Sequence, residues 1–481
     1  MANIPVPTIT EFNQMLDDKT FEIYAKGLTC TINQVDSDYA TQLVKKYKPK
    51  SISEVCQFVA MIRPGCKSLL DDFLNRRPYT TGVKELDNLL EDSEHRMIYQ
   101  ESIMKYLIWL GIKESESYDI IKKIAKKKFK EQELKELKAK LLKGWIKQVG
   151  KEDGFEETWI VIEQASMYSF NASHSLSYAY DSLYGAYLKA HFPLEYYTVV
   201  LNEYSGDEIR TEKLTNELSY FNIKLESPKF RYSKANYFCD KETNIIYKGI
   251  GSIKYCNETI GNELYELKNN LYNTFLDLLI DIAKTSINSR QLEILIKIGF
   301  FSEFGKSAKL TKIVDLYNNV YTKSQFKKDN MSEQNIKLFR KYANKETEKL
   351  FKEVNTYDLI NNIIPNIKNE ELPIQTLFEC QKENCGSIIF KDKNYDDDVM
   401  VATKVNINQF GTPFITLYCL NNGTVNTLKA DKTYFNNKPI SDYDVIKIKG
   451  IDEKYKRRKI DGKWQITEDK EYILSSYAMV L

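Results

Sequence analysis

The sequence predicts an α+β, multidomain protein in which two mainly helical regions are followed by a small β-barrel domain. Apolar residues recur every three or four positions through most of residues 20–201, which indicates amphipathic helices. After Pro373 the pattern changes to alternating Tyr, Val, Ile and Thr with turn signals at 421–423 and 461–462, which is typical of strands and hairpins. A chain of 481 residues is also too long for one hydrophobic core, so we expect several domains.

Residues 1–220 are predicted to form a helical domain. Prolines at 49, 64 and 193 are typical of helix boundaries. The expected helices are Ala40–Tyr47, Ser51–Ile62, Arg96–Leu110, Tyr118–Ile146, Glu156–Met167 and His174–Ala190.

Residues 221–370 are predicted to form a second, mixed domain. Short strands or extended segments are expected at Phe221–Leu225, Asn236–Cys239 and Ile245–Tyr247. Helices then follow from Glu258 to about Ile360, with breaks near residues 288 and 305. The remaining residues, 371–481, are about as many as a small five-stranded barrel of the OB type requires.

Composition sets limits on the class of protein. Lys+Arg 69 and Asp+Glu 67 nearly cancel, so a nucleic-acid surface must come from local clustering. Residues 1–10 lack the features of a signal peptide, and no segment has the roughly 20 apolar residues that a membrane helix needs. The eight cysteines are scattered, unlike those of a small disulfide scaffold. We therefore expect a cytoplasmic protein with no membrane partner.

A lysine-rich segment, Tyr118–Lys130, is the first candidate binding site. Its cations fall within about three turns of a predicted helix, where lysines four apart repel one another. A polyanion such as a triphosphate or a nucleic-acid backbone would relieve that repulsion. The alternative is a solvated basic helix, which the following glutamates 131, 133 and 136 support. The lysines are Lys122, Lys123, Lys126, Lys127, Lys128 and Lys130.

A polar segment before an apolar helix, Tyr168–Tyr180, is the second candidate. Asn171 or Ser173 could cap that helix and leave free N–H groups for an anion. His174 has no neighbouring carboxylate in sequence, so a hydrolase triad is not indicated. The alternative is a capped structural helix. The polar side chains are Asn171, Ser173, His174, Ser175 and Tyr178.

The third candidate is the glycine-containing loop within Tyr247–Ile260. Gly249 and Gly251 lie between a predicted strand and a predicted helix, but Lys254 stands where a dinucleotide-binding loop has its third glycine. A helix–hairpin–helix fits better, with backbone N–H groups and Lys254 approaching a DNA phosphate.

A basic patch in the tail is the fourth candidate. Residues 454–459 are almost all basic and lie near Trp464, on an expected hairpin. OB domains bind single strands through a basic groove with aromatic stacking, so Lys456, Arg457, Arg458 and Trp464 are predicted to contact single-stranded DNA. The alternative is a plain exposed loop.

Four other motifs are weak. Asp36 with Asp38, and Asp396–Asp398, do not stand in the context of a metal site. Cys380 and Cys385 have no second pair at zinc spacing, so we predict no bound metal. Gln375–Phe378 is similar to a sliding-clamp-binding peptide but is one residue short.

In order, these segments resemble the bacterial DNA polymerase III alpha subunit, a C-family replicative polymerase. The most specific match is Phe170–Ser175 with Tyr178-Ala179 and Leu188–Pro193. The ordered resemblance covers roughly Asp17 to Gly305, and the strand-rich tail falls where that family carries an OB fold. The other matching segments are Asp17–Ile23, Gln34–Ser37, Ile62–Gly65, Leu70–Phe73, Ile98–Met104, Lys122–Lys128, Phe221–Asn236, Gly249–Lys254 and Ile287–Arg290.

The resemblance implies a fingers domain at 1–220, a helix–hairpin–helix and clamp-binding region at 221–370, and an OB domain at 371–481. It implies that Lys122, Lys123, Lys127 and Lys128 bind triphosphate or template phosphates. It also implies that Asn171, Ser173, His174 and Tyr178 line the nucleotide site. A sliding clamp is a further implied partner.

Several positions depart from the family pattern. Lys122 and Lys123 replace arginines, which keeps the charge but loses bidentate phosphate binding. Lys126 replaces a glycine. Tyr255-Cys256-Asn257 stands where the hairpin normally has Gly-x-Gly, which puts close approach of the backbone to DNA in question.

In this family the metal-binding aspartates lie in a palm domain that precedes the resembling segments. We therefore expect one part of a split polymerase, a nucleotidyltransferase that is inactive alone. A separate palm-bearing chain would hold Mg²⁺, this chain would hold no cofactor, and the palm-facing surface would lie around Pro5–Asp38. The alternative is a non-catalytic DNA-binding or regulatory protein built from polymerase parts. Abundant Asn, Lys, Ile and Tyr indicate low-GC coding, which suits a phage gene in a bacterial cytoplasm.

Overall fold

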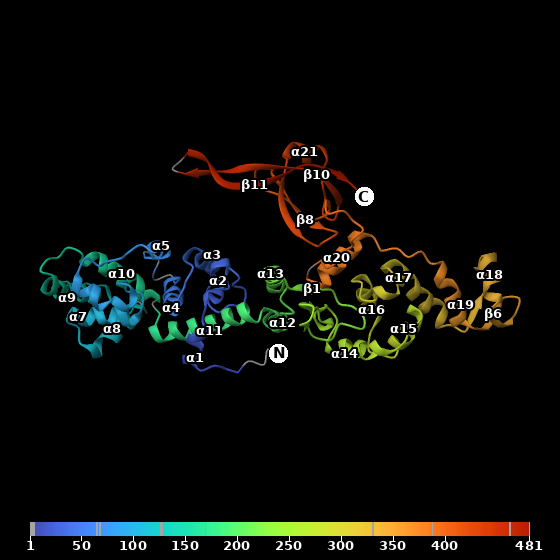
Figure 1. Ribbon diagram of the computed structural model, residues 1–481, viewed down its shortest axis with the longest axis horizontal. Helices are drawn as coiled ribbons and strands as arrows, with labels where there is room; N and C mark the ends of the chain where they lie inside the picture. Colours follow the sequence, from blue (N-terminus) through green and yellow to red (C-terminus); the bar gives the residue numbers. More distant parts are fainter. Residues whose placement is uncertain are drawn as a thin grey trace. The chain divides into compact units, whose positions relative to one another are not determined.

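The computed structural model describes residues 5–63, 66, 69–125, 128–168, 170–329, 331–386, 388–460 and 463–480. The chain forms two compact units, Met1–Val200 and Leu201–Leu481. Helices build the first unit, and the second adds a closed barrel at its C-terminal end (Figure 1). The prediction of helical regions followed by a small barrel is therefore confirmed. In the described ranges, no helix is both long and apolar enough to cross a membrane.

Local signals start and stop the helices of the first unit. Asp17, Ser37 and Ser51 each accept a hydrogen bond from a backbone N–H three residues later, which satisfies one unpaired donor of the following helix. Gly27 ends the second helix in the left-handed region at φ 74°. The elements are α1 (Ile9–Met15), α2 (Asp18–Lys26), α3 (Asp38–Tyr47), α4 (Ile52–Met61), α5 (Leu70–Leu74), α6 (Lys84–Leu89), η2 (Glu91–Ser93), α7 (Gln100–Trp109), α8 (Glu114–Ala125), α9 (Glu131–Val149), α10 (Phe155–Tyr168), α11 (Ala172–His191) and α12 (Pro193–Glu203).

The single helix predicted over Tyr118–Ile146 is instead two helices, α8 and α9. Helix α8 ends at Ala125 and α9 begins at Glu131; like charges four apart in this lysine-rich segment, such as Lys122 and Lys126, disfavour a continuous helix. Helices α6 to α10 pack around Tyr106, Leu141 and Trp145.

The long helix α11 is the centre of the rest of this unit. It packs against α2 and α4. The ring of Phe12, on α1, is fully buried and stacks on Tyr184 of α11 with centroids 4.0 Å apart. Helix α11 thereby joins segments that are more than a hundred residues apart in sequence.

The second unit begins with a helix and a three-stranded sheet of order β1-β3-β2, in which β1 and β3 are parallel. Helices then surround a core that includes Phe275, Leu295 and Phe301. The elements are α13 (Glu208–Leu218), η3 (Ser219–Phe221), β1 (Lys224–Glu226), β2 (Phe238–Asp240), β3 (Ile245–Tyr247), η4 (Ile250–Ser252), α14 (Glu258–Glu266), η5 (Leu267–Asn269), α15 (Phe275–Ile282), α16 (Ser289–Lys297), η6 (Ser302–Phe304), α17 (Ser307–Leu316) and η7 (Tyr317–Tyr321).

A second small sheet interrupts the region predicted to be helical as far as Ile360. Strands β4 (Gln325–Lys327), β5 (Ala343–Glu346) and β6 (Leu350–Val354) pair in the order β4-β6-β5, with α18 (Glu333–Arg340) after β4. The helical prediction was wrong here because Phe326 and Phe351 lie opposite each other and pack on Phe339 of α18. The chain then continues through α19 (Thr356–Ile363), η8 (Ile364–Asn366) and α20 (Ile374–Cys385).

The C-terminal barrel closes in the order β10-β11-β9-β8-β7. Its interior is filled by side chains such as Ile415, Leu417, Ile446 and Leu474. Strands β10 and β11 are long and pair as far as Ile460 with Lys463. The elements are β7 (Val399–Ile407), β8 (Pro413–Cys419), β9 (Val425–Ala430), α21 (Lys432–Asn437), β10 (Val445–Ile460) and β11 (Lys463–Met479).

Candidate nucleotide and nucleic-acid sites

The N-terminal end of α11 borders a cavity of about 400 Å³ in the first unit. Its lining joins segments that are far apart in sequence. The α2–α3 connection, the end of α4, the start of α7 and the start of α11 all contribute. The lining residues are Gln34, Arg63, Gln100, Phe170, Asn171, His174 and Tyr178.

A cationic and aromatic cluster forms one side of this cavity. His174 lies between Phe170 and Tyr178, with ring centroids 5.3 and 4.5 Å away. Tyr178 shares one face of α11 with His174, and Phe170 stands just before the helix. The Arg63 guanidinium lies 4.4 Å from the centre of the Phe170 ring and donates a hydrogen bond to Gln34. A guanidinium held over a ring suits recognition of a phosphate or a base.

Neighbouring residues already satisfy part of the helix end. The Ala172 N–H donates to the Glu101 carboxylate at 2.8 Å, and the His174 N–H donates to the capping Asn171 side chain at 3.2 Å. The Gln100 N–H donates to the Phe170 carbonyl at 3.0 Å, which fixes α7 against the start of α11. A bound anion would therefore depend on Arg63 and His174 more than on bare backbone donors.

The structure brings three of the predicted nucleotide-site residues together in the cavity: Asn171, His174 and Tyr178. Ser173 is exposed on the same helical turn but is not among the lining residues. Ser175 is fully buried and faces the core.

Sequence reasoning missed Arg63, Gln34 and Gln100 as site residues. All three stand within or beside segments that resemble the polymerase family, so the resemblance could have pointed to them. Their convergence with α11 depends on tertiary packing, which helical periodicity does not report.

The lysine run lies at the end of α8. Lys122 and Lys123 are exposed in its last turn, within 5.4 and 5.8 Å of the Tyr118 and Phe129 rings. Lys128 is also exposed, whereas Lys126 and Lys127 lie outside the described residues. None of the described lysines of this run is among the residues that line the α11 cavity.

In the second unit, the two glycines of the third candidate are required by packing of the chain on itself. A Cβ on Gly249 would lie 2.5 Å from the Asn236 carbonyl carbon, and one on Gly251 would lie 3.1 Å from the Ala235 oxygen. Both glycines therefore let the loop pass close to the segment before β2.

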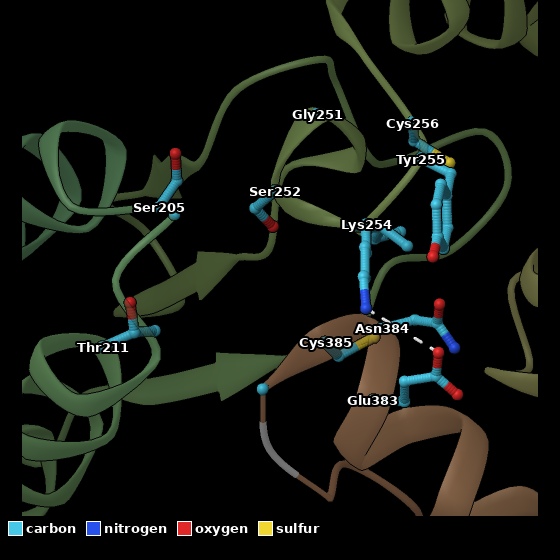
Figure 2. A pocket seen from close by; sticks show the side chains of 13 residues that line it. Ser205, Thr211, Gly251, Ser252, Lys254, Tyr255, Cys256, Glu383, Asn384 and Cys385 are labelled. Carbon is cyan, nitrogen blue, oxygen red and sulfur yellow. Dashed lines mark ion pairs between the residues drawn. The ribbon is translucent and has the colours of Figure 1, made fainter.

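Lys254 stands on the edge of a cavity of about 370 Å³ between this loop and the end of α20 (Figure 2). Its backbone N–H donates to the Asn384 carbonyl at 2.8 Å, and its Nζ lies 3.7 Å from the Glu383 carboxylate. Both charged side chains are about half exposed. A DNA phosphate could compete for the Lys254 ammonium, because exposed ion pairs are weak.

Lys248, which the sequence did not single out, is a buried anchor beside this cavity. Its Nζ donates to the Cys385 carbonyl at 2.5 Å. Together with the Lys254 backbone N–H, it satisfies the last carbonyl groups of α20. Burial raises the pKa of the nearby Cys256 thiol to about 11, so that thiol is protonated at neutral pH.

The structure puts the basic residues of the tail, Lys456, Arg457 and Arg458, on β10 and Trp464 on β11, in the hairpin formed by these strands. Their side chains lie outside the described part of the structure. Nearby on the hairpin, Tyr455 and Ile466 are exposed.

Residues of the weaker motifs take part in the ion pairs and the packing of the fold. Asp396 is paired with Lys447 at 2.6 Å, and this hydrogen bond lowers the pKa of its carboxyl group. Leu377 and Phe378 of the clamp-like segment are buried in α20, so a clamp contact through them would require that helix to unfold. Among the described residues, no cluster of three or more His, Cys, Asp or Glu side chains could hold a metal ion.

Comparison with known proteins shows which families two regions of this chain resemble. Residues 8–149 match the bacterial DNA polymerase III alpha subunit finger domain, and residues 222–310 match a helix-hairpin-helix motif. The chain is 29% identical over 386 residues to the DNA polymerase III subunit alpha of Aquifex aeolicus, covering 76% of this chain and 32% of that protein.

Two further relatives carry the same name. The Campylobacter jejuni protein is 28% identical over 77% of this chain and 30% of its own length. The Bacillus subtilis protein is 26% identical over 62% of this chain and 27% of its own length. The chain thus spans about a third of the length of the curated relatives it matches. Over residues 8–149 and 222–310, the chain therefore matches the finger domain of the bacterial DNA polymerase III alpha subunit and a helix-hairpin-helix motif, and it is similar in sequence to these subunits.

Proposed function

We propose that this chain binds the incoming deoxynucleoside triphosphate and the primer–template DNA of a C-family replicative polymerase. We further propose that the palm aspartates are supplied by a separate chain. The α11 cavity carries the proposal, because it joins Arg63, which lies within the region that matches polymerase fingers, to His174 and two aromatic rings that follow that region in the chain. Arg63 would hold a phosphate, and the rings would contact the base or sugar.

Two other features support the proposal. Lys122 and Lys123 are exposed cations available to triphosphate or template phosphates. Within the predicted palm-facing segment, Val6 and Ile9 expose apolar side chains, as a surface that docks a partner would. The Mg²⁺ ions that neutralise charge on the reacting phosphates would be held by the palm.

Nucleotide binding tests the cavity directly. Arg63→Ala should weaken binding of a deoxynucleoside triphosphate by about tenfold or more, the loss expected for one charge-assisted phosphate contact. Binding of the corresponding deoxynucleoside should change little. Lys147→Ala, an exposed position on α9, is the matched control. Equal triphosphate binding by wild type and Arg63→Ala would remove the cavity from the proposal.

Primer extension with Mg²⁺ tests the rest, using this chain alone and then mixed with a chain that carries a C-family palm. Synthesis only in the mixture is the expected result. DNA binding without synthesis in the mixture would favour a non-catalytic DNA-binding or regulatory protein. Synthesis by this chain alone would contradict the assignment of the aspartates to another chain.

A further inference from the structure

Tyr255 occupies an unusual backbone position in the glycine-containing loop. Its φ is 69°, in the left-handed region, which a residue with a Cβ adopts less readily than glycine. The loop therefore carries an aromatic ring at a position whose backbone conformation favours glycine.

Residues of α16 hold this ring and its backbone in place. The Arg290 guanidinium lies 3.6 Å from the centre of the Tyr255 ring, and the Gln291 amide donates to the Tyr255 carbonyl at 2.8 Å. The Tyr255 side chain is nonetheless 42% exposed. Lys254 places a second cation 5.4 Å from the same ring. An exposed ring flanked by two cations results.

Most backbone N–H groups of this loop already donate hydrogen bonds within the chain and are not available to a phosphate. Their hydrogen bonds go to the chain itself: Gly251 to Ala235, Ser252 to Gly249, Ile253 to Ile250, Lys254 to Asn384 and Cys256 to Ile253. Helix α14 begins just after the loop with Glu258 in its first turn, where a carboxylate opposes a second anion. A DNA contact here must depend on side chains.

We infer that Tyr255, Arg290 and Lys254 together form a contact for the backbone of duplex DNA. The ring packs against a deoxyribose, and the two cations bind the flanking phosphates. This inference rests on the proposed DNA-binding function. Glu383 beside Lys254, and Glu293 and Glu379 in the cavity that Arg290 also lines, limit the positive charge of the surface.

The backbone strain provides a clean test, because Tyr255→Gly removes the ring and relieves the strain at the same position. Tyr255→Gly should melt at an unchanged or slightly higher temperature, yet bind a 20-bp duplex about tenfold more weakly, as for loss of one aromatic contact. Tyr255→Phe keeps the ring and should bind like wild type. Arg290→Gln should weaken binding and reduce the salt dependence by about one phosphate. Glu383→Gln should strengthen binding a few-fold, because it frees Lys254.

The outcomes separate the inference from the function on which it rests. Wild type that binds duplex DNA no more tightly than Tyr255→Gly would overturn the inference and leave DNA binding standing. A loss confined to single-stranded DNA of the same length would also overturn it, because the contact would then belong to unpaired strands. Wild type that binds no DNA at all would contradict the proposed function and the inference with it.

Discussion

Lys189 on α11 is fully buried, and replacing it with methionine should destabilise the first unit. Its Nζ donates to the Leu28 and Cys30 carbonyls at 2.9 and 2.7 Å. The ammonium also lies 5.5 and 5.2 Å from the Tyr196 and Tyr197 rings. Methionine fills a similar volume without a donor, so the change removes these interactions while leaving the packing nearly intact.

The magnitude follows from opposing contributions. Two charge-assisted hydrogen bonds contribute about 1.5–3 kcal/mol each, and each cation–π contact adds about 0.5–1 kcal/mol. Removing a buried ammonium recovers several kcal/mol of its desolvation cost. We therefore expect Lys189→Met to lower the free energy of unfolding by about 2–4 kcal/mol, because two buried carbonyls lose their donors.

Urea unfolding followed by circular dichroism measures this loss, with the exposed Lys147→Met as control, which should change stability by less than about 0.5 kcal/mol. The free energy of opening that hydrogen exchange measures for residues 28–34 should fall by the same amount. That segment leads to Gln34, the hydrogen-bond partner of Arg63, so nucleotide binding should weaken as well. A Lys189→Met protein as stable as the control would refute the reasoning, because the carbonyls would then have found other donors.

Three further predictions concern other parts of the chain. Gly249→Ala should cost about 2 kcal/mol or more in thermal unfolding, because its Cβ would lie 2.5 Å from Asn236, whereas Gly206→Ala meets nothing within 4 Å and should be neutral; equal melting of the two would contradict the packing argument. Hydrogen bonds from Arg340 and Lys328 lower the pKa of Glu346 from 4.5 to about 2, so this carboxylate stabilises the small sheet above pH 4.5 and its contribution disappears as pH falls toward 2. Ring signals of labelled Phe326 and Phe351 should report the loss, and Glu346→Gln should abolish the pH dependence. Substituting both Lys122 and Lys123 with alanine should reduce palm-complemented primer extension at least about tenfold without changing the melting temperature, and unchanged synthesis would remove these lysines from the phosphate site.

The fold was predictable where the pattern of apolar residues and the capping signals agreed. Ser37 and Ser51 precede clear helical periodicity, and helices begin just after both. Alternation in the tail likewise predicted the barrel. The sheet that contains Phe326 and Phe351 was not predictable, because its strands are three to five residues long and most of their other positions are polar or charged. Only pairing between distant segments distinguishes such strands from a helix.

The candidate sites likewise contain some residues that the sequence could predict and others that it could not. Asn171 caps α11, and His174 and Tyr178 lie four residues apart on it, so these three are close in sequence; the resemblance named them together with Ser173, which does not line the cavity. Arg63 reaches them from a segment more than a hundred residues earlier, and Lys254 meets α20 about 130 residues later in the chain. The conformation of Tyr255 could not be predicted from its own residue type, because tyrosine disfavours the left-handed region that the loop imposes.

The small sheet of β4, β5 and β6 indicates where this chain could accept an inserted domain. It lies outside the helix-hairpin-helix match at 222–310, and its Phe326, Phe339 and Phe351 share one hydrophobic cluster with Leu359 of α19. The chain leaves and returns at one point, since the Thr356 hydroxyl donates to the Tyr321 carbonyl at 3.4 Å. Because its ends adjoin, the segment between Tyr321 and Thr356 is a natural place to attach a reporter domain, whereas deleting the segment would uncover the buried Leu359.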